Sequence, residues 1–282
     1  MNNTKTEWCD STWNPVTGCL HGCEYCYARG IARRFKGFEP RCGGEEIPEG
    51  KGTCVGSIHN TTHGETLHVF SKQPKRRLHA RGYPSGKFVK ASYPYAFEPT
   101  FHRYKLDEYA KKKGRTIFVC SMGDLFGDWV PDAWITAVFE ACARSPQHRY
   151  LFLTKNIHGY EDFDVVKKDN YWYGQTWDCL NTGLTNYNYY EKQINQFLSI
   201  EPLQSGNIPF DSIKAGWFDW VIVGAETGKR KYKVTPRREW IDDIVKYCAQ
   251  NKVPVFMKES LRGIMGDDFI QEYPWKIKEG NT

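Results

Sequence analysis

The sequence predicts an α/β fold built as a (β/α) barrel, full or partial, with one long insertion. From about residue 115 onward, short runs rich in β-branched and aromatic residues alternate with longer segments of helical periodicity. The runs are apolar almost throughout, which is typical of parallel strands covered on both faces. An open doubly wound sheet fits the same pattern, so the sequence leaves the choice between these two architectures open.

The expected elements follow in chain order. A strand before Cys19 and six later ones give about seven, a number that suits a barrel. The proline-initiated segments 131–144 and 236–250 carry apolar residues at helical spacing, which predicts two helices. The six later strands are expected at 116–121, 149–154, 171–175, 196–200, 220–223 and 253–257.

The alternation is missing from residues 37–92, which are rich in glycine and show little periodicity. Loops of this length inside a compact domain are usually functional or disordered. We therefore expect residues 1–36 and 93–282 to form the core, and residues 37–92 to form a long irregular insertion.

Composition narrows the class of protein. With 282 residues, 40% hydrophobic and 15% aromatic, the chain has enough apolar surface to bury a sizeable core, which argues against intrinsic disorder. No run approaches the roughly 18 apolar residues that cross a bilayer. The first residues contain no apolar signal core. We therefore expect a soluble, cytoplasmic protein with no membrane partner.

Three of the ten cysteines lie within eight residues of one another, at Cys19, Cys23 and Cys26. In a reducing compartment, metal binding or catalysis explains such a cluster better than disulfides do. Closely spaced cysteines ligate iron–sulfur clusters, and three ligands leave one iron of a four-iron cluster open. The alternative is zinc, for which Cys23 and Cys26 would supply half of a site.

The residues around the triplet carry a family resemblance. The cysteines follow Trp13-Asn14-Pro15-Val16-Thr17-Gly18, and Tyr25 directly precedes Cys26. This arrangement resembles the signature of the radical S-adenosylmethionine (SAM) superfamily. More narrowly, it resembles a phage-associated radical SAM family of unassigned function that is related to spore photoproduct lyase. Further matching segments are 117–126, 146–155, 201–203, 220–228 and 253–258.

The resemblance implies a chemistry. Cys19, Cys23 and Cys26 would hold a [4Fe–4S] cluster whose open iron binds SAM, and the cleaved cofactor would abstract hydrogen from a substrate. A flavodoxin or ferredoxin would act as the reductase of the cluster.

Polar residues follow six of the expected strands, and the carboxyl ends of parallel strands form the usual active-site rim. By resemblance, Gly123 and Asp124 would meet the methionine amino group of SAM. For Glu201 and Glu226, the alternative is a salt bridge with Lys155 or Lys258. The candidates for ribose and adenine contacts are Gln175, Ser199, Glu201, Gly224 and Glu226.

The insertion contains a second set of metal-ligand types. Cys42, Cys54, His59 and His63 have the side chains that zinc takes, although the gap between the two cysteines is too long for a standard knuckle. The alternative is a glycine-rich loop with unrelated polar residues.

Charge is concentrated in one stretch. Between residues 71 and 115, thirteen Lys or Arg stand against three Asp or Glu, a net charge of +10, and aromatic residues are interleaved with them. Such a stretch suits a nucleic-acid backbone with bases available for stacking, although a solvated basic face is the simpler alternative. Arg29, Arg33, Arg34 and Lys36 would extend the same patch. The candidate substrate contacts are Arg76, Arg77, Lys155 and Lys258.

The leading hypothesis is therefore a radical SAM enzyme that modifies or repairs a nucleic acid or a nucleotide base. One alternative is radical SAM chemistry on a peptide or a small metabolite. The other is a non-catalytic nucleic-acid-binding protein that zinc stabilises.

Overall fold

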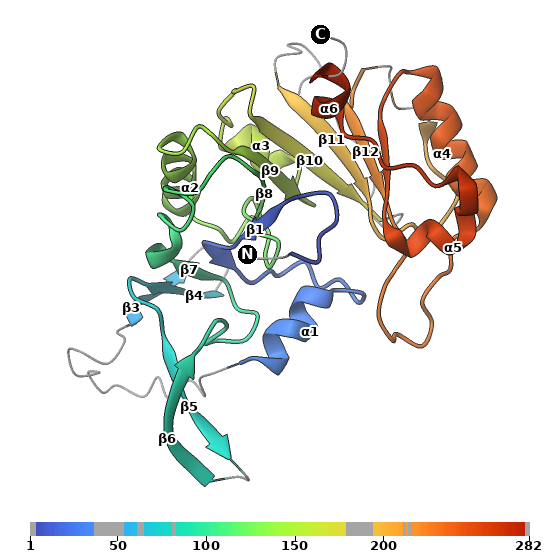
Figure 1. Cartoon of the computed structure of the whole chain (residues 1–282). Helices are drawn as coiled ribbons and strands as arrows, with labels where there is room; N and C mark the ends of the chain where they lie inside the picture. Colours follow the sequence, from blue (N-terminus) through green and yellow to red (C-terminus); the bar gives the residue numbers. More distant parts are fainter. Residues whose placement is uncertain are drawn as a thin grey trace. The chain divides into compact units, whose positions relative to one another are not determined.

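The computed structural model describes residues 4–36, 54–60, 65–80, 83–178, 194–210, 213 and 216–279 (Figure 1). Within it the chain divides into two compact units. The first consists of residues 1–11, 115–117 and 149–282, and the second of residues 12–114 and 118–148.

Seven strands form one parallel sheet, and their order along the sheet follows their order in the chain. A doubly wound sheet reverses its strand order at a switch point, whereas this order advances in one direction, as in a (β/α) barrel. The predicted α/β class with a partial barrel is confirmed. The strands are β1 (Ser11–Trp13), β8 (Thr116–Val119), β9 (Arg149–Thr154), β10 (Tyr171–Trp177), β11 (Asn195–Ile200), β12 (Trp220–Val223) and β13 (Val255–Met257).

Two strands are shorter than the sequence predicts, for local reasons. At the end of β8, Cys120 has a positive φ of 58°, which turns the chain out of the sheet before residue 121. At the start of β13, Pro254 has no N–H to donate, so it contributes only its carbonyl, which accepts from Val221 N at 3.0 Å.

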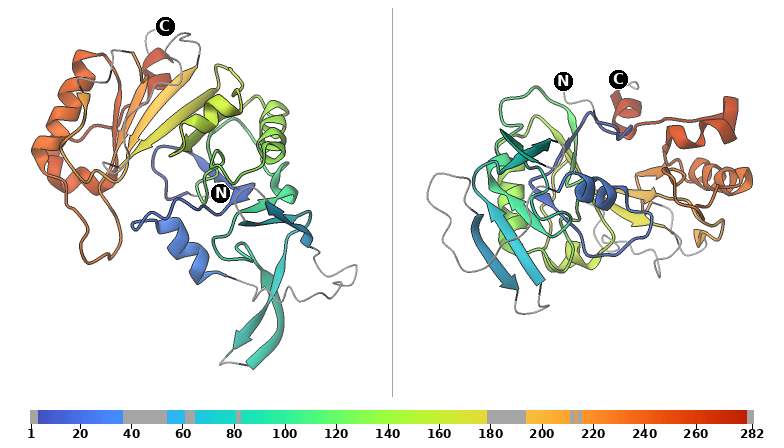
Figure 2. Two further views of the ribbon diagram at one scale, coloured as in Figure 1. Left: turned by 180° about the vertical axis from the view of Figure 1, so that it is seen from behind. Right: turned by 90° about the horizontal axis from the view of Figure 1, so that it is seen from below.

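Both predicted helices are present, as α2 (Asp132–Ala143) and α4 (Arg238–Gln250). In α4 the buried residues Ile241, Ile244 and Cys248 recur at helical spacing and pack with β11 to β13, beside which Figure 2 shows the helix. None of the helices in the described ranges combines the length and apolar character that crossing a bilayer requires. The remaining helices are α1 (Tyr27–Arg34), α3 (His158–Asp162), α5 (Arg262–Met265) and α6 (Pro274–Glu279), with 3-10 turns at Arg103–Lys105, Glu259–Leu261 and Gly266–Asp268.

The insertion contains strands where the sequence predicts no regular element. A four-stranded sheet has the order β2-β7-β4-β3, and β5 and β6 form a separate two-stranded ribbon. The sheet depends on β4 pairing in parallel with β7, which lies beyond the insertion, so local periodicity could not reveal it. The strands are β2 (Val16–Thr17), β3 (Cys54–Asn60), β4 (Glu65–Phe70), β5 (Lys75–Ala80), β6 (Tyr83–Lys90) and β7 (Thr100–His102).

A buried histidine ties β7 to β2. His102 is fully buried, and its Nε2 lies 2.9 Å from Thr17 Oγ1 while its Nδ1 lies 3.3 Å from Tyr104 Oη. Burial, and then the charge of Lys105, lower the pKa of His102 well below its ordinary value of 6.5. Burial also lowers the pKa of His68 on β4, although Glu98 opposes the shift.

We expect the stability of the second unit to fall as the pH drops below about 6.5. An unfolded histidine takes up a proton there, whereas folded His102 resists protonation until lower pH, so stability is lost as pH falls toward the folded pKa. Thermal unfolding over that range would show a shallower pH dependence in His102→Gln than in the wild type. Parallel pH profiles for the two proteins would contradict the assignment to His102.

Candidate metal centre and strand-end cluster

The three clustered cysteines lie on one loop between β2 and α1. All three are half-buried, and none of the seven cysteines whose side chains are described forms a disulfide. Cys26 N donates to Cys23 O at 3.3 Å, and Cys26 caps α1 by accepting Arg29 N on its Sγ at 3.4 Å. Helix formation from residue 27 therefore fixes the last cysteine of the triplet at a defined place.

The loop that follows β8 holds the cysteine loop in position. Gly18 pairs with Gly123, and Gly18 N donates to Met122 O at 2.9 Å. Asn14 Oδ1 accepts Met122 N at 2.8 Å and Ser121 Oγ at 3.2 Å. A defined set of contacts thus joins the cysteine loop to the 121–124 loop.

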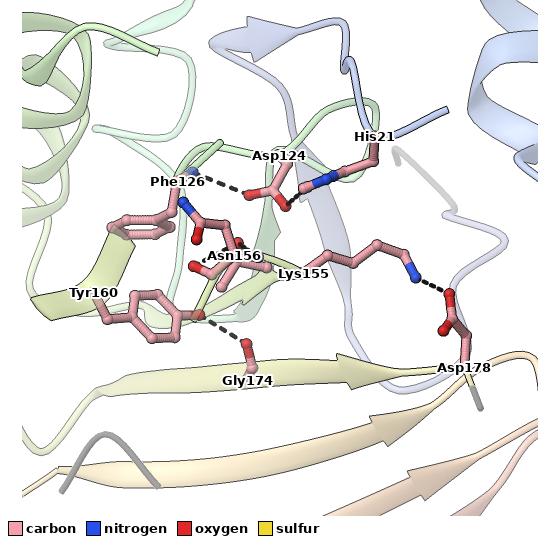
Figure 3. A network of polar contacts seen from close by, with 9 residues as sticks. His21, Asp124, Phe126, Lys155, Asn156, Tyr160, Gly174 and Asp178 are labelled. Atoms are coloured by element: carbon pink, nitrogen blue, oxygen red, sulfur yellow. Dashed lines mark hydrogen bonds and ion pairs between the residues drawn. The ribbon is translucent and has the colours of Figure 1, made fainter. Parts of the chain in front are cut away.

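A histidine between the cysteines makes a further link. His21 Nε2 lies 2.8 Å from Asp124 Oδ2, while Asp124 Oδ1 accepts Phe126 N at 3.0 Å (Figure 3). The His21 ring also packs edge-on against Trp129, with 4.9 Å between the ring centroids. Sequence reasoning passed over His21, and its place between Cys19 and Cys23 was the one available signal.

Burial, Asp124 and the ionisable groups of the cysteine loop shift the pKa of Cys19. The pKa of the Cys19 thiol is raised by burial first, then by the charge of Asp124 and more weakly by Cys23 and Cys26. Three thiols and a carboxylate therefore lie close enough to repel one another when they are ionised. Their ionised forms need a compensating positive charge nearby. A bound metal centre would supply that charge.

The three thiols are the donor type that an iron–sulfur cluster takes. Among the described residues, no three His, Cys, Asp or Glu side chains converge on a point where one ion could sit. A four-iron cluster holds its cysteine ligands at separate corners, so it needs three spaced thiols from one loop rather than a tight convergence. Cys19, Cys23 and Cys26 supply three thiols from one loop.

Gly18 offers a test of the loop geometry. Its φ is +92°, and an added Cβ would lie 2.2 Å from Glu98 O, so Gly18→Ala is expected to cost about 1–3 kcal/mol and lower metal loading. Gly30 in α1 has nothing within 4 Å of an added Cβ, so Gly30→Ala should stabilise the helix by up to about 1 kcal/mol. Thermal unfolding and iron content measure both variants. Equal behaviour of the two would refute the role of Gly18.

In the first unit, the structure brings together four predicted strand-end residues. Ser199 Oγ donates to Glu201 Oε2 at 3.1 Å, and Lys258 Nζ lies 2.5 Å from Glu201 Oε1. An added Cβ at Gly224 would lie 2.8 Å from Lys258 Cδ and 3.1 Å from Glu201 Oε1, so a larger residue there would displace the side chains of this pair. Burial disfavours the charge of Lys258, but Glu201 and then Glu7 outweigh it and raise the pKa of the amine.

The other charged strand-end residues are paired as well. The salt bridge that was the alternative for Glu201 is present, with Lys258, whereas the same alternative for Glu226, with Lys155 or Lys258, is wrong. Glu226 is held instead by Arg230, whose Nε and second guanidinium nitrogen lie at 2.8 and 2.6 Å from its oxygens. Arg230 is four residues away on the same loop, so the pair forms locally. It also lowers the pKa of the carboxyl.

Two further candidates lie on or near β9 and β10. Lys155, just after β9, pairs with Asp178 (Figure 3). Gln175 on β10 is buried and stands opposite Leu198 of β11 in the ladder.

Several sequence-predicted residues lie outside what the structure describes. Cys42 and His63 belong to such segments. Cys54 and His59 lie on β3, and Arg76 and Arg77 on β5, with only their backbone described. The zinc hypothesis for the insertion therefore stays a prediction.

Comparison with known proteins adds one finding. Residues 3–261 match the family described as "Protein of unknown function (DUF5131)". No curated protein and no solved structure matches the chain.

Proposed function

This chain belongs to the DUF5131 family, whose function is unknown, and we propose from its site that it is a radical SAM enzyme. The observation that carries the proposal is the loop of three half-buried thiols, held by the N-terminus of α1 and by the 121–124 loop. The resemblance to a phage-associated radical SAM family related to spore photoproduct lyase points the same way.

Cys19, Cys23 and Cys26 would hold a [4Fe–4S] cluster. Such a cluster would supply one-electron reduction of SAM and, through it, hydrogen abstraction from a substrate. Asp124 orients the cysteine loop through His21, and its own position is fixed by Phe126 N. Contacts of this kind, behind the ligands, orient side chains that bind a metal centre.

By the resemblance, residues at the strand ends of the parallel sheet are the candidate cofactor contacts. Ser199, Glu201 and Lys258 form one hydrogen-bonded group, which fixes the Glu201 carboxylate. A fixed carboxylate beside a backbone turn at Gly224 suits recognition of ribose hydroxyls, because both oxygens accept hydrogen bonds. Gln175 and Glu226 are the further candidates for cofactor contacts. An oxygen-sensitive cluster suits the cytoplasm. A flavodoxin or ferredoxin would be its reductase.

The proposed substrate class is nucleic acid, in modification or repair. It is supported by the charge of +10 between residues 71 and 115, where acidic residues are almost absent. A peptide or small metabolite does not require such a concentration of charge.

Anaerobic reconstitution tests the proposal. Iron and sulfide are counted, and the protein is then incubated with dithionite and SAM while 5′-deoxyadenosine and methionine are measured. The expected result is four irons per chain and both products. Zinc in place of iron, or intact SAM after reduction, would overturn the proposal and favour a metal-stabilised binding protein.

A further inference from the structure

We propose that nucleic acid docks on a basic surface made by the C-terminal end of α1 and the base of the β5–β6 ribbon. The inference rests on the proposed function and names the docking site of its substrate. We define this surface, the α1–ribbon surface, by its exposed described residues: Arg33, Arg34, Phe35, Lys36, Lys72, Lys75 and Lys90.

Backbone contacts join the two parts of the surface. Lys36, just after α1, forms a parallel bridge with Tyr93, which follows β6. At the ribbon base, Ala91 N donates to Pro74 O at 2.8 Å. Figures 1 and 2 show the end of α1 turned toward the ribbon, so cations 36 to 57 residues apart in sequence belong to one surface of the second unit.

The charge of the surface is one-sided. Neither residues 27–36 nor residues 66–97 contain a single Asp or Glu. In the ribbon, Lys75 stands directly opposite Lys90. Like charges directly opposite in a ladder destabilise a sheet, so folding alone does not favour this pair. A bound anion would relieve the repulsion.

The shape of the element and its aromatic residue favour nucleic acid among polyanions. A two-stranded β-ribbon is one of the elements that fit a duplex groove. Phe35 is 47% exposed, and the Arg34 guanidinium lies 5.2 Å from its ring centroid. An exposed aromatic ring with a stacked arginine suits an unpaired base beside a phosphate backbone.

The position of α1 relates the surface to the metal centre. Cys26 is the N-cap of α1, and the helix has 8 residues, so its basic end lies about 12 Å further along the helix axis. The inner face of α1 packs through Ala28 and Ala32 against Phe97 and Met122, which leaves its basic end to solvent. A strand held at that end would have its bases within reach of the cluster loop, as enzymes that act on extruded bases require.

Salt-dependent binding tests the inference. Fluorescence anisotropy of a labelled DNA duplex and of the corresponding single strand is measured over a range of salt concentrations. In Arg33→Gln/Arg34→Gln we expect roughly tenfold or greater loss of affinity near 0.1 M salt, and a salt slope smaller by about 2. The matched control, Lys246→Gln/Lys252→Gln, removes two exposed cations that lie outside both the surface and the basic stretch 71–115, and should bind like the wild type.

A second variant separates binding from folding. Lys75→Gln/Lys90→Gln should lose affinity in the same way while its thermal midpoint stays level or rises, because the opposed charges are removed. Iron content is measured for every variant.

Three results would overturn the inference. The first is an equal loss of DNA affinity in the variants of the α1–ribbon surface and in the control variant. The second is the lack of salt-dependent DNA binding by the wild type. The third is displacement of DNA by polyglutamate at equal charge. SAM cleavage by the wild type is scored separately, so intact cleavage without DNA binding would refute the docking surface and leave the radical chemistry standing.

Discussion

Cys23→Ala is expected to abolish cluster loading and reductive SAM cleavage. Three thiolates are the fewest that hold a four-iron cluster with one open iron, so losing one leaves two and destabilises the whole group. Cys23 lies at the middle of the triplet, and its charge acts on Cys19. After anaerobic reconstitution, iron content and visible absorption should fall to the level of protein-free controls.

Cys248→Ala is the matched control. Its thiol is 1% exposed in the core of the first unit, where burial, then the charge of Glu272, raises the pKa to about 12. Cys248 packs in the apolar core of the first unit, whereas the triplet belongs to the second unit, so this variant should load iron like the wild type. Wild-type iron content and SAM cleavage in Cys23→Ala would exclude the triplet as the cluster site.

Trp220→Ala is expected to lower the free energy of unfolding of the first unit by about 3–5 kcal/mol. Trp220 is fully buried on β12, with Trp275 and Phe256 against its ring at centroid distances of 5.1 and 6.1 Å. Its Nε1 also donates to Glu272 O at 2.9 Å, so truncation opens a cavity and leaves a carbonyl without its donor. Denaturant unfolding followed by near-ultraviolet circular dichroism measures the loss.

Two further variants separate the contribution of the Trp220 ring from that of its hydrogen bond and supply a surface control. Trp220→Phe keeps a ring in the cavity but loses the hydrogen bond, so its loss should be smaller, about 1–2 kcal/mol. Tyr232→Ala removes a ring that is 75% exposed and should change stability by less than about 0.5 kcal/mol. A loss below 1 kcal/mol in Trp220→Ala would show that this aromatic cluster does not hold the unit together.

The strands were predictable because their local sequence is sufficient. Strands buried on both faces need apolar residues at every position, and β9 and β12 match the predicted residues 149–154 and 220–223 at both ends. The strands of the insertion were not predictable, because β4 is stabilised by pairing with β7 rather than by a pattern of its own.

The same distinction holds for the site. Local spacing identified Cys19, Cys23 and Cys26, since all three lie on one loop. The partner of His21 is Asp124, 103 residues away, and no local pattern marks that pair. Glu226 was assigned the wrong partner because several cations were available in sequence and only the path of the loop selects Arg230.

The sequence by itself therefore determined the strands of the parallel sheet and the spacing of the three thiols. Both follow from residue types at short spacing, where burial and soft-ligand chemistry act locally. The tertiary structure decided that the 121–124 loop contacts the cysteine loop. It also decided which carboxylate pairs with which cation, and which basic residues share a surface. Those outcomes depend on distances between segments far apart in the chain, which are fixed only when the strands pair and α1 packs.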